Sequence, residues 1–312
     1  AYLDENHPDR ILLCEANQWP QDVRPYFGDG DEFQMGFHFP LMPRIFMALR
    51  RGERAPLQWI LDRTPEIPSN CQWCIFLRNH DELTLEMVTE DERQWMWEQY
   101  APEPRMRLNL GIRRRLSPLL DNNHQKIVLA NSLLFTMPGS PIIYYGDEIG
   151  MGDNIWLFDR NGVRTPMQWS AGRNAGFSSA APEDLYAPVI ADEHYNPLKI
   201  NVAQARSDPG SIWQQLKHFI AIRKQHKSFG WGNFEWIEFV NPGIAAYIRT
   251  YQDEQIIVIN NLTVEDQSIN LKQINSDEVY EDLITGDKFT LSPEGNLRLD
   301  IPPYGYLWLL VH

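Results

Sequence analysis

The sequence predicts a parallel α/β unit of the (β/α)-barrel kind, followed by a smaller all-β domain. Up to about residue 227, short apolar runs alternate with helix-like stretches, as in parallel βαβ units. Three of these runs end in polar residues, and barrel enzymes carry their active sites at the carboxyl ends of the strands. From residue 228 onward, short strand-like runs separated by turn residues predict an antiparallel β-sandwich. We therefore expect domains at 1–227 and 228–312.

The strands expected in the first domain are short and apolar, at residues 11–14, 34–39, 73–77 and 141–145. The first is expected to be buried because its four residues, ILLC, are all apolar. Helical patterns lie at 44–50, 125–135 and 212–225. A closed barrel of this kind has eight strands, so four strand–helix units predict half a barrel.

Two long inserts interrupt the first domain, at 82–123 and 150–208, and both read as irregular loops. Loops that long in a compact domain are usually functional. In the second domain the expected strands form two pairs, at 245–251 with 255–260 and at 297–301 with 306–311.

The composition excludes some partners. Among 312 residues, 28 are Lys or Arg and 42 are Asp or Glu, which gives a net charge of −14. That balance argues against binding to nucleic acid phosphates or to anionic lipid surfaces. No apolar run approaches the roughly 20 residues of a membrane helix. Eleven Trp residues fit either sugar stacking or a core of large side chains.

The three cysteines are expected to be buried free thiols. Cys71 and Cys74 form a lone C-x-x-C, and neither a second pair nor a His pair follows at the spacing of a zinc site. We therefore expect no metal site here. Free thiols and the absence of a signal-peptide pattern fit a reducing cytoplasm.

Two strand ends carry residues suited to glycosidic chemistry. Glu15 follows an apolar run and precedes Trp19, so desolvation could keep its carboxyl group protonated as a general acid; the alternative is a surface glutamate. His80 and Asp81 could hold sugar hydroxyls, and an ionised Asp81 would stabilise an oxocarbenium-like transition state. The alternative there is a solvated loop. His38, on the second strand, is expected to be a core histidine.

A family resemblance joins these segments. EANQWPQDVRPYFGDGDE, FLRNHDELTLEMVT, GSPIIYYGDEIGMGDN and DRNGVRTPMQWS occur in this order. Together they resemble trehalose synthases of the α-amylase superfamily, almost without a break from residue 11 to about 201 and more loosely to the end. The resemblance implies the carboxyl-terminal half of a (β/α)8 barrel, strands five to eight, followed by the sandwich.

The resemblance also implies roles for individual residues. Glu15 matches the general acid/base, Asp81 the transition-state stabiliser and His80 a histidine bonded to the same glucose ring. Further substrate-binding matches are an arginine near the mouth of the site and two residues that help to close the pocket, namely Arg164, Asn17 and Glu86.

One family feature is missing from these residues. The nucleophilic aspartate of the superfamily lies in a GFRLD-like segment, and the 312 residues contain none. A retaining mechanism needs two carboxyl groups about 5 Å apart. The chain is therefore expected to be the carboxyl-terminal part of a longer enzyme, a reading that its start without a methionine also favours, and to be inactive alone.

The reaction implied for the whole enzyme is the interconversion of maltose and trehalose, with glucose kept in the pocket between the two steps. No organic cofactor is implied, and any calcium ligands would lie largely in the missing half. Two alternatives stay open: a fragment of an oligo-1,6-glucosidase, and a non-catalytic sugar-binding or assembly module. The open strands of a half barrel also predict pairing with a second copy.

Overall fold

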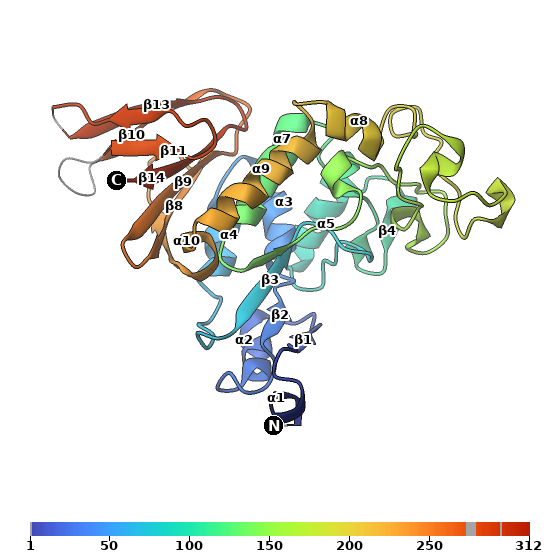
Figure 1. The fold of residues 1–312 in the computed structure, drawn as a ribbon, viewed down its shortest axis with the longest axis horizontal. Coiled ribbons are helices and arrows are strands. Elements are labelled where there is room, and N and C mark those ends of the chain that lie inside the picture. The colour runs from blue at the N-terminus through green and yellow to red at the C-terminus, as the bar shows by residue number, and fades with distance from the viewer. Residues whose placement is uncertain (1, 273–278, 294) are drawn as a thin grey trace.

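The computed structural model describes residues 2–272, 279–293 and 295–312, and its first domain is built on a sheet of four parallel strands (Figure 1). The order β1-β2-β3-β6 follows the chain, and every neighbouring pair is parallel. The strands are short: β1 (Leu13–Cys14), β2 (Met35–Phe37), β3 (Gln72–Phe76) and β6 (Ser140–Ile142). This confirms the prediction of four parallel strand–helix units.

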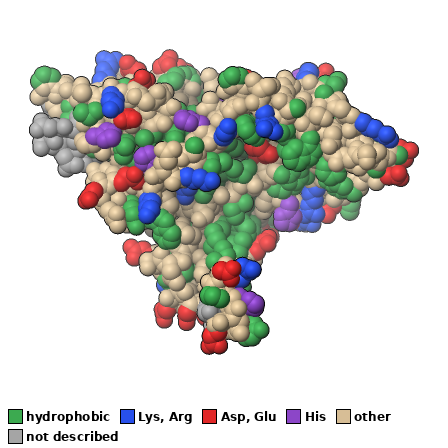
Figure 2. Space-filling view, in the orientation of Figure 1, with side chains coloured by type: hydrophobic (Ala, Val, Ile, Leu, Met, Phe, Trp, Pro, Cys, Tyr) green, Lys and Arg blue, Asp and Glu red, His purple; other side chains and the backbone are tan. Residues whose placement is uncertain are grey.

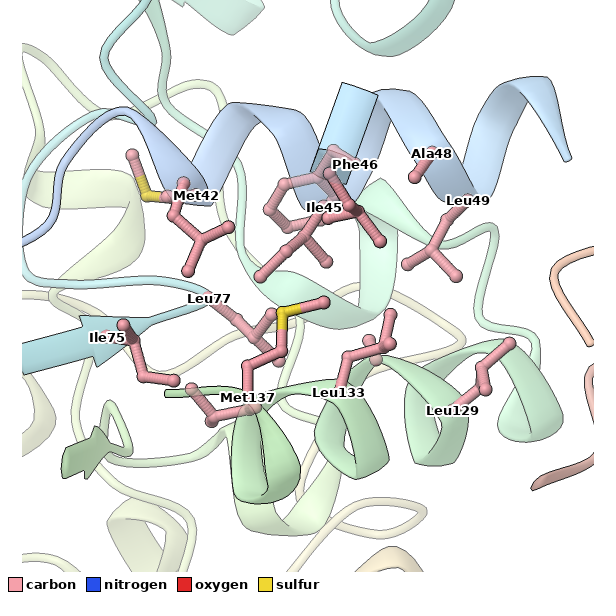
Figure 3. Close-up of a cluster of buried hydrophobic side chains, with 14 of the residues drawn as sticks. Met42, Ile45, Phe46, Ala48, Leu49, Ile75, Leu77, Leu129, Leu133 and Met137 are labelled. Carbon is pink, nitrogen blue, oxygen red and sulfur yellow. The ribbon is translucent and has the colours of Figure 1, made fainter. Parts of the chain in front are cut away.

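The helices that cover this sheet bury long apolar faces. The main ones are α3 (Leu41–Arg51), α4 (Ala55–Leu61), α7 (His124–Thr136) and α9 (Ile212–Gln225). Figure 3 shows side chains of α3, among them Ile45 and Leu49, directed toward Leu133 and Leu129 of α7. Since these residues are almost completely buried, their removal from water is the main stabilisation of this layer.

After α10 (Ser228–Trp231), the chain forms two antiparallel sheets. The larger one has the order β12-β11-β14-β9-β8-β7, and the smaller one pairs β10 with β13. The bounds are β7 (Asn233–Ile237), β8 (Ile244–Tyr251), β9 (Glu254–Asn261), β10 (Gln267–Lys272), β11 (Val279–Asp282), β12 (Lys288–Thr290), β13 (Asn296–Ile301) and β14 (Tyr306–Val311). The inner faces of the two sheets enclose a separate apolar cluster.

The large sheet also packs against the helices of the first domain. The Trp308 indole donates a hydrogen bond to Ser132 Oγ of α7 at 2.9 Å, and its ring lies 4.6 Å from that of Phe219 on α9. Thr136 and Tyr247 share a buried hydrogen bond of 2.6 Å. One hydrophobic cluster therefore runs from α3 through α7 and α9 to the sheet.

The remaining elements belong to the ends and to the inserts. They are α1 (Tyr2–Asn6), α2 (Pro20–Val23), α5 (Glu90–Tyr100), β4 (Arg107–Leu108), β5 (Gly111–Ile112), α6 (Leu116–Leu119) and α8 (Val202–Ser207), together with short 3-10 turns. The second insert lies on the side of the helices opposite to the sandwich (Figure 1). Within the described residues, no helix has the length and apolar character needed to cross a membrane.

Three expectations were wrong in detail. Ile11, Leu12 and Leu13 are 61%, 39% and 43% exposed, because they lie in or just before β1, which pairs on one side only within the described residues. Strands β13 and β14 do not pair with each other, since the turn at 302–305 carries the chain from the small sheet to the large one. The insert at 82–123 is not irregular: it contains α5 and the β4–β5 hairpin.

Candidate active site

The parallel sheet brings the ends of β1 and β3 to the same edge. Glu15 follows β1 directly, and residues 78–86 follow β3. The amide nitrogen of Asn17 donates to Glu86 Oε2 at 2.7 Å and to Thr84 Oγ1 at 3.3 Å, so the two strand ends are in direct contact. Two of the predicted site residues, Asn17 and Glu86, therefore lie together although 69 positions separate them.

Glu15 is exposed, and the desolvation expected from Trp19 is not present. Trp19 packs instead against the main hydrophobic cluster and against Trp59, with ring centroids 6.0 Å apart. The sequence argument for a buried general acid is therefore wrong for the described residues. The position of Glu15 directly after β1 agrees with the prediction.

Asp81 is held by a cation that the sequence reasoning missed. Arg160 Nε donates to Asp81 Oδ1 at 2.5 Å, and the backbone N–H of Glu82 donates to the same oxygen at 2.9 Å. Partial burial raises the pKa of Asp81, but hydrogen bonds from Glu82 and Arg160 outweigh this and lower it to about 2. Asp81 is therefore ionised at neutral pH, as a transition-state stabiliser must be.

Glu82 lies beside Asp81 and shares its cation. Arg160 Nη2 lies 3.1 Å from Glu82 Oε2, and the side-chain amide of Asn109 donates to Glu82 Oε1 at 2.8 Å. Burial raises the pKa of Glu82, and the neighbouring Asp81 carboxylate raises it further. The two carboxyl groups therefore differ in pKa: Asp81 carries the negative charge more readily, and Glu82 takes up a proton more readily.

Arg164 lies close to His80 but contacts its backbone. Arg164 Nε donates to the His80 carbonyl oxygen at 2.7 Å, while the His80 side chain is exposed. The hydroxyl of Tyr186 donates to the Arg164 carbonyl at 2.5 Å. The second insert is therefore anchored to the end of β3 by Arg160 and Arg164, which are four residues apart.

Buried polar contacts join the two inserts to each other. Asp153 accepts from Arg114 Nε at 2.9 Å and from the Arg115 backbone at 2.7 Å. Burial raises the pKa of Asp147 to about 7, although Arg115 and Arg78 oppose the rise. Arg114 and Arg115 of the first insert thus hold Asp153 of the second insert.

Other residues of interest lie away from the site. His38 is 2% exposed; its Nδ1 accepts from the Leu41 backbone at 3.2 Å, and its Nε2 is 2.7 Å from Thr64 Oγ1. It is thus a core histidine, as predicted. The three cysteines are buried free thiols, also as predicted. No group of three or more His, Cys, Asp and Glu side chains is arranged to hold a metal ion in the described ranges.

Sequence comparison shows that the chain is similar to curated trehalose synthases. The trehalose synthase of Pimelobacter sp. (strain R48) is 48% identical over 98% of this chain and 56% of its own length. The trehalose synthase/amylase of Mycobacterium tuberculosis is 48% identical over 98% of this chain and 52% of its own. An oligo-1,6-glucosidase of Bacillus cereus is 30% identical over 54% of this chain. The chain spans about half the length of the curated trehalose synthases in these first two comparisons.

Solved structures and family models agree with the fold. An alpha-amylase from H. orenii superposes with a TM-score of 0.74 at 22% identity and covers 100% of this chain and 55% of its own. Residues 234–308 match the model for the maltogenic amylase C-terminal domain. The model for the alpha-amylase catalytic domain matches residues 1–232, and this chain therefore belongs to the alpha-amylase family.

Proposed function

We propose that this chain is part of a trehalose synthase that interconverts maltose and trehalose by intramolecular transglucosylation with retention. The observation that carries the proposal is the contact between the ends of β1 and β3, where Asn17 donates a hydrogen bond to Glu86. An ionised Asp81 lies at the same edge of the sheet, after β3. The 48% identity to curated trehalose synthases supports the choice of substrate.

The roles follow from the chemistry of a retaining enzyme. Glu15 donates a proton to the glycosidic oxygen of maltose, and later removes the proton of the glucose hydroxyl that attacks. Asp81 accepts hydrogen bonds from sugar hydroxyls, and its negative charge stabilises the oxocarbenium-like transition state. The attacking carboxylate lies outside the 312 residues in this proposal, about 5 Å from the carboxyl group of Glu15.

Asn17 and Glu86 support closure over the freed glucose. Their hydrogen bond joins the loops after β1 and β3, across which a sugar would enter. The buried Oδ1 of Asn17 has no hydrogen-bond partner among the described residues, and it is suited to accept from a hydroxyl group. A closed pocket keeps water away from the glycosyl intermediate and so favours isomerisation over hydrolysis.

A chimera tests the proposal. This chain would replace the matching segment of the Pimelobacter enzyme, and we expect trehalose to form from maltose. Glu15→Gln and Asp81→Asn should lower the rate by about 10²–10⁴. Glu235→Gln, which changes an exposed glutamate on β7, should leave the rate unchanged. A folded chimera that hydrolyses isomaltose but makes no trehalose would favour the oligo-1,6-glucosidase alternative.

The 312-residue chain alone is expected to make no trehalose, because a retaining mechanism needs a second carboxylate as nucleophile. Trehalose formed from maltose by the purified chain, and abolished by Glu15→Gln, would disprove this part of the proposal.

We also propose that the open edge of the parallel sheet associates with a second copy of the chain. Strands β1 and β6 each have one neighbour among the described residues, and apolar side chains of residues 11–13 are exposed beside β1. Hydrophobic side chains gather near the centre of the face that Figure 2 shows. Unpaired strand edges with exposed apolar residues favour such pairing.

A further inference from the structure

We propose that Arg160 is a positioning residue, which fixes the Asp81 carboxylate in one orientation for sugar hydroxyls, and that Arg113 holds the turn that presents Arg160. The inference rests on the proposed function only for the role of Asp81. The arrangement itself is independent of which sugar is bound.

The Arg160 guanidinium bridges two neighbouring carboxylates. Its Nε contacts Asp81 Oδ1 at 2.5 Å, its Nη2 contacts Glu82 Oε2 at 3.1 Å, and its Nη1 lies 3.3 Å from Asp159 Oδ1. A planar guanidinium donates in fixed directions, so two simultaneous bonds set the relative orientation of its partners. The Glu82 backbone N–H also donates to Asp81 Oδ1, and this second donor hinders rotation of the carboxylate.

A second arginine holds the turn before Arg160. Arg113 Nη1 donates to the carbonyl oxygens of Leu157 at 2.7 Å and of Asp159 at 2.5 Å, and its Nη2 donates to that of Ile155 at 3.2 Å. Asp159 has a φ of 53°, in the left-handed region that costs energy for a residue with a side chain. The bonds from Arg113 offset that cost, and they keep the turn in the conformation that places Arg160 over Asp81.

The surroundings support a role in orientation rather than in general stability. Hydrogen bonds from Glu82 and Arg160 favour the ionised form of Asp81, whereas the Asp81 carboxylate raises the pKa of Glu82. Without the arginine, two carboxyl groups would face each other at the end of β3, and one of them would take up a proton more readily. Because Arg160 contacts Asp81 directly, its replacement should change the titration of Asp81 itself, whereas the loss of an ion pair elsewhere in the chain should not.

The test follows the Asp81 carboxyl carbon by NMR in the full 312-residue chain, with Asp81→Asn for assignment. In the wild type, the signal should stay almost constant from pH 6 to pH 3, in line with a pKa of about 2. In Arg160→Gln, we expect the midpoint to rise and the signal to titrate within this range, because the hydrogen bond and the charge of Arg160 that lower the pKa of Asp81 are lost. Arg298→Gln removes an exposed ion pair with Asp300 and should leave the signal unchanged.

Two further variants keep the proposal testable. Arg160→Lys keeps the charge but loses the planar fork, so the Asp81 midpoint should lie between those of the wild type and Arg160→Gln; if Arg160→Gln does not fold, this variant alone decides. Arg113→Gln should raise the midpoint in the same direction, since the turn is released.

If Asp81 titrated with the wild-type midpoint in folded Arg160→Gln or in Arg160→Lys, the proposed role of Arg160 would be wrong. Wild-type titration in Arg113→Gln would overturn the role of Arg113. Failure of the chimera to make trehalose would refute the proposed function and leave these titrations valid.

Discussion

His38 directly follows β2 and Asp81 follows β3, yet the structure gives the two side chains opposite environments. His38 is buried among apolar residues, and desolvation lowers its pKa to about 4. Asp81 is half-buried and is held in the ionised form by Arg160. The imidazole is thus a neutral part of the core, while the carboxylate is a charge available for a substrate.

The first prediction concerns pH and His38. An unfolded histidine has a pKa of about 6.5, so between pH 6.5 and pH 4 the unfolded chain binds more protons than the folded one. The contribution of His38 to the free energy of unfolding should therefore be complete above pH 6.5 and fall, by about 3 kcal/mol at most, as the pH drops to 4. Urea unfolding of wild type and His38→Gln at several pH values measures this.

The matched control for that prediction is His194→Gln, because His194 is an exposed histidine in the second insert. It should keep the pH dependence of the wild type, whereas His38→Gln should show a weaker one. Equal pH dependence in the wild type and in His38→Gln would contradict the prediction.

At the scale of single residues, the sequence predicts which residues stand at the ends of strands, but not which distant side chains bind them. Glu15, His80 and Asp81 stand directly after apolar runs, a local signal. Arg160 lies in the second insert, 79 residues beyond the Asp81 side chain that it contacts. No periodicity or spacing rule joins such positions, because the folding of a loop decides the contact.

Strand β1 shows how an element differs from its sequence pattern. Four apolar residues at 11–14 predicted a buried strand, but only Cys14 is buried. Apolar runs are buried in a parallel sheet because neighbours and helices cover both faces. Here β1 is an outer strand, so the same run lies partly in solvent.

The second prediction concerns this open edge. Size-exclusion chromatography with light scattering should show association of the chain that increases with concentration. Leu13→Lys places a charge on the edge and should shift the equilibrium toward the monomer. Val264→Lys changes another exposed apolar residue, in the turn between β9 and β10, and should not. A monomer at every concentration would exclude pairing through this edge.

The first insert held an overlooked signal for a helix. Thr89 caps α5, since its side chain accepts from the Glu92 backbone while the Glu92 side chain accepts from the Thr89 backbone. This capping box is visible in the sequence as T-x-x-E. The apolar pattern does not predict this helix, because its two tryptophans and one methionine are consecutive and form no stripe along one helix face.

At the scale of the whole molecule, the two domains share one core. Trp308 of the large sheet is fully buried between α7 and α9 and bonds to Ser132. Arg249 Nη1 donates to the Thr136 carbonyl at 2.6 Å across the same boundary. Because these contacts are buried, unfolding either the helices or the large sheet would expose apolar surface and unpaired polar groups on the other.

The third prediction follows from that shared core. Trp308→Phe should lower the free energy of unfolding by about 2–4 kcal/mol, since it leaves a cavity and leaves Ser132 without its donor. Far-UV circular dichroism and fluorescence should still report one coincident transition. Trp231→Phe, at an exposed position, should change stability by less than about 0.5 kcal/mol. Two separate transitions would show that the domains unfold independently.

The sequence by itself determined the four parallel strands of the first domain and the strand ends that carry Glu15 and Asp81, because apolar runs and the polar residues that end them are local properties. Its motifs also determined the family. Only the tertiary structure decided that Glu15 is exposed, that Asn17 meets Glu86 and that Arg160 holds Asp81. The physical reason is that burial and ion pairing depend on segments far apart in the chain, and their approach is set by packing of the whole molecule.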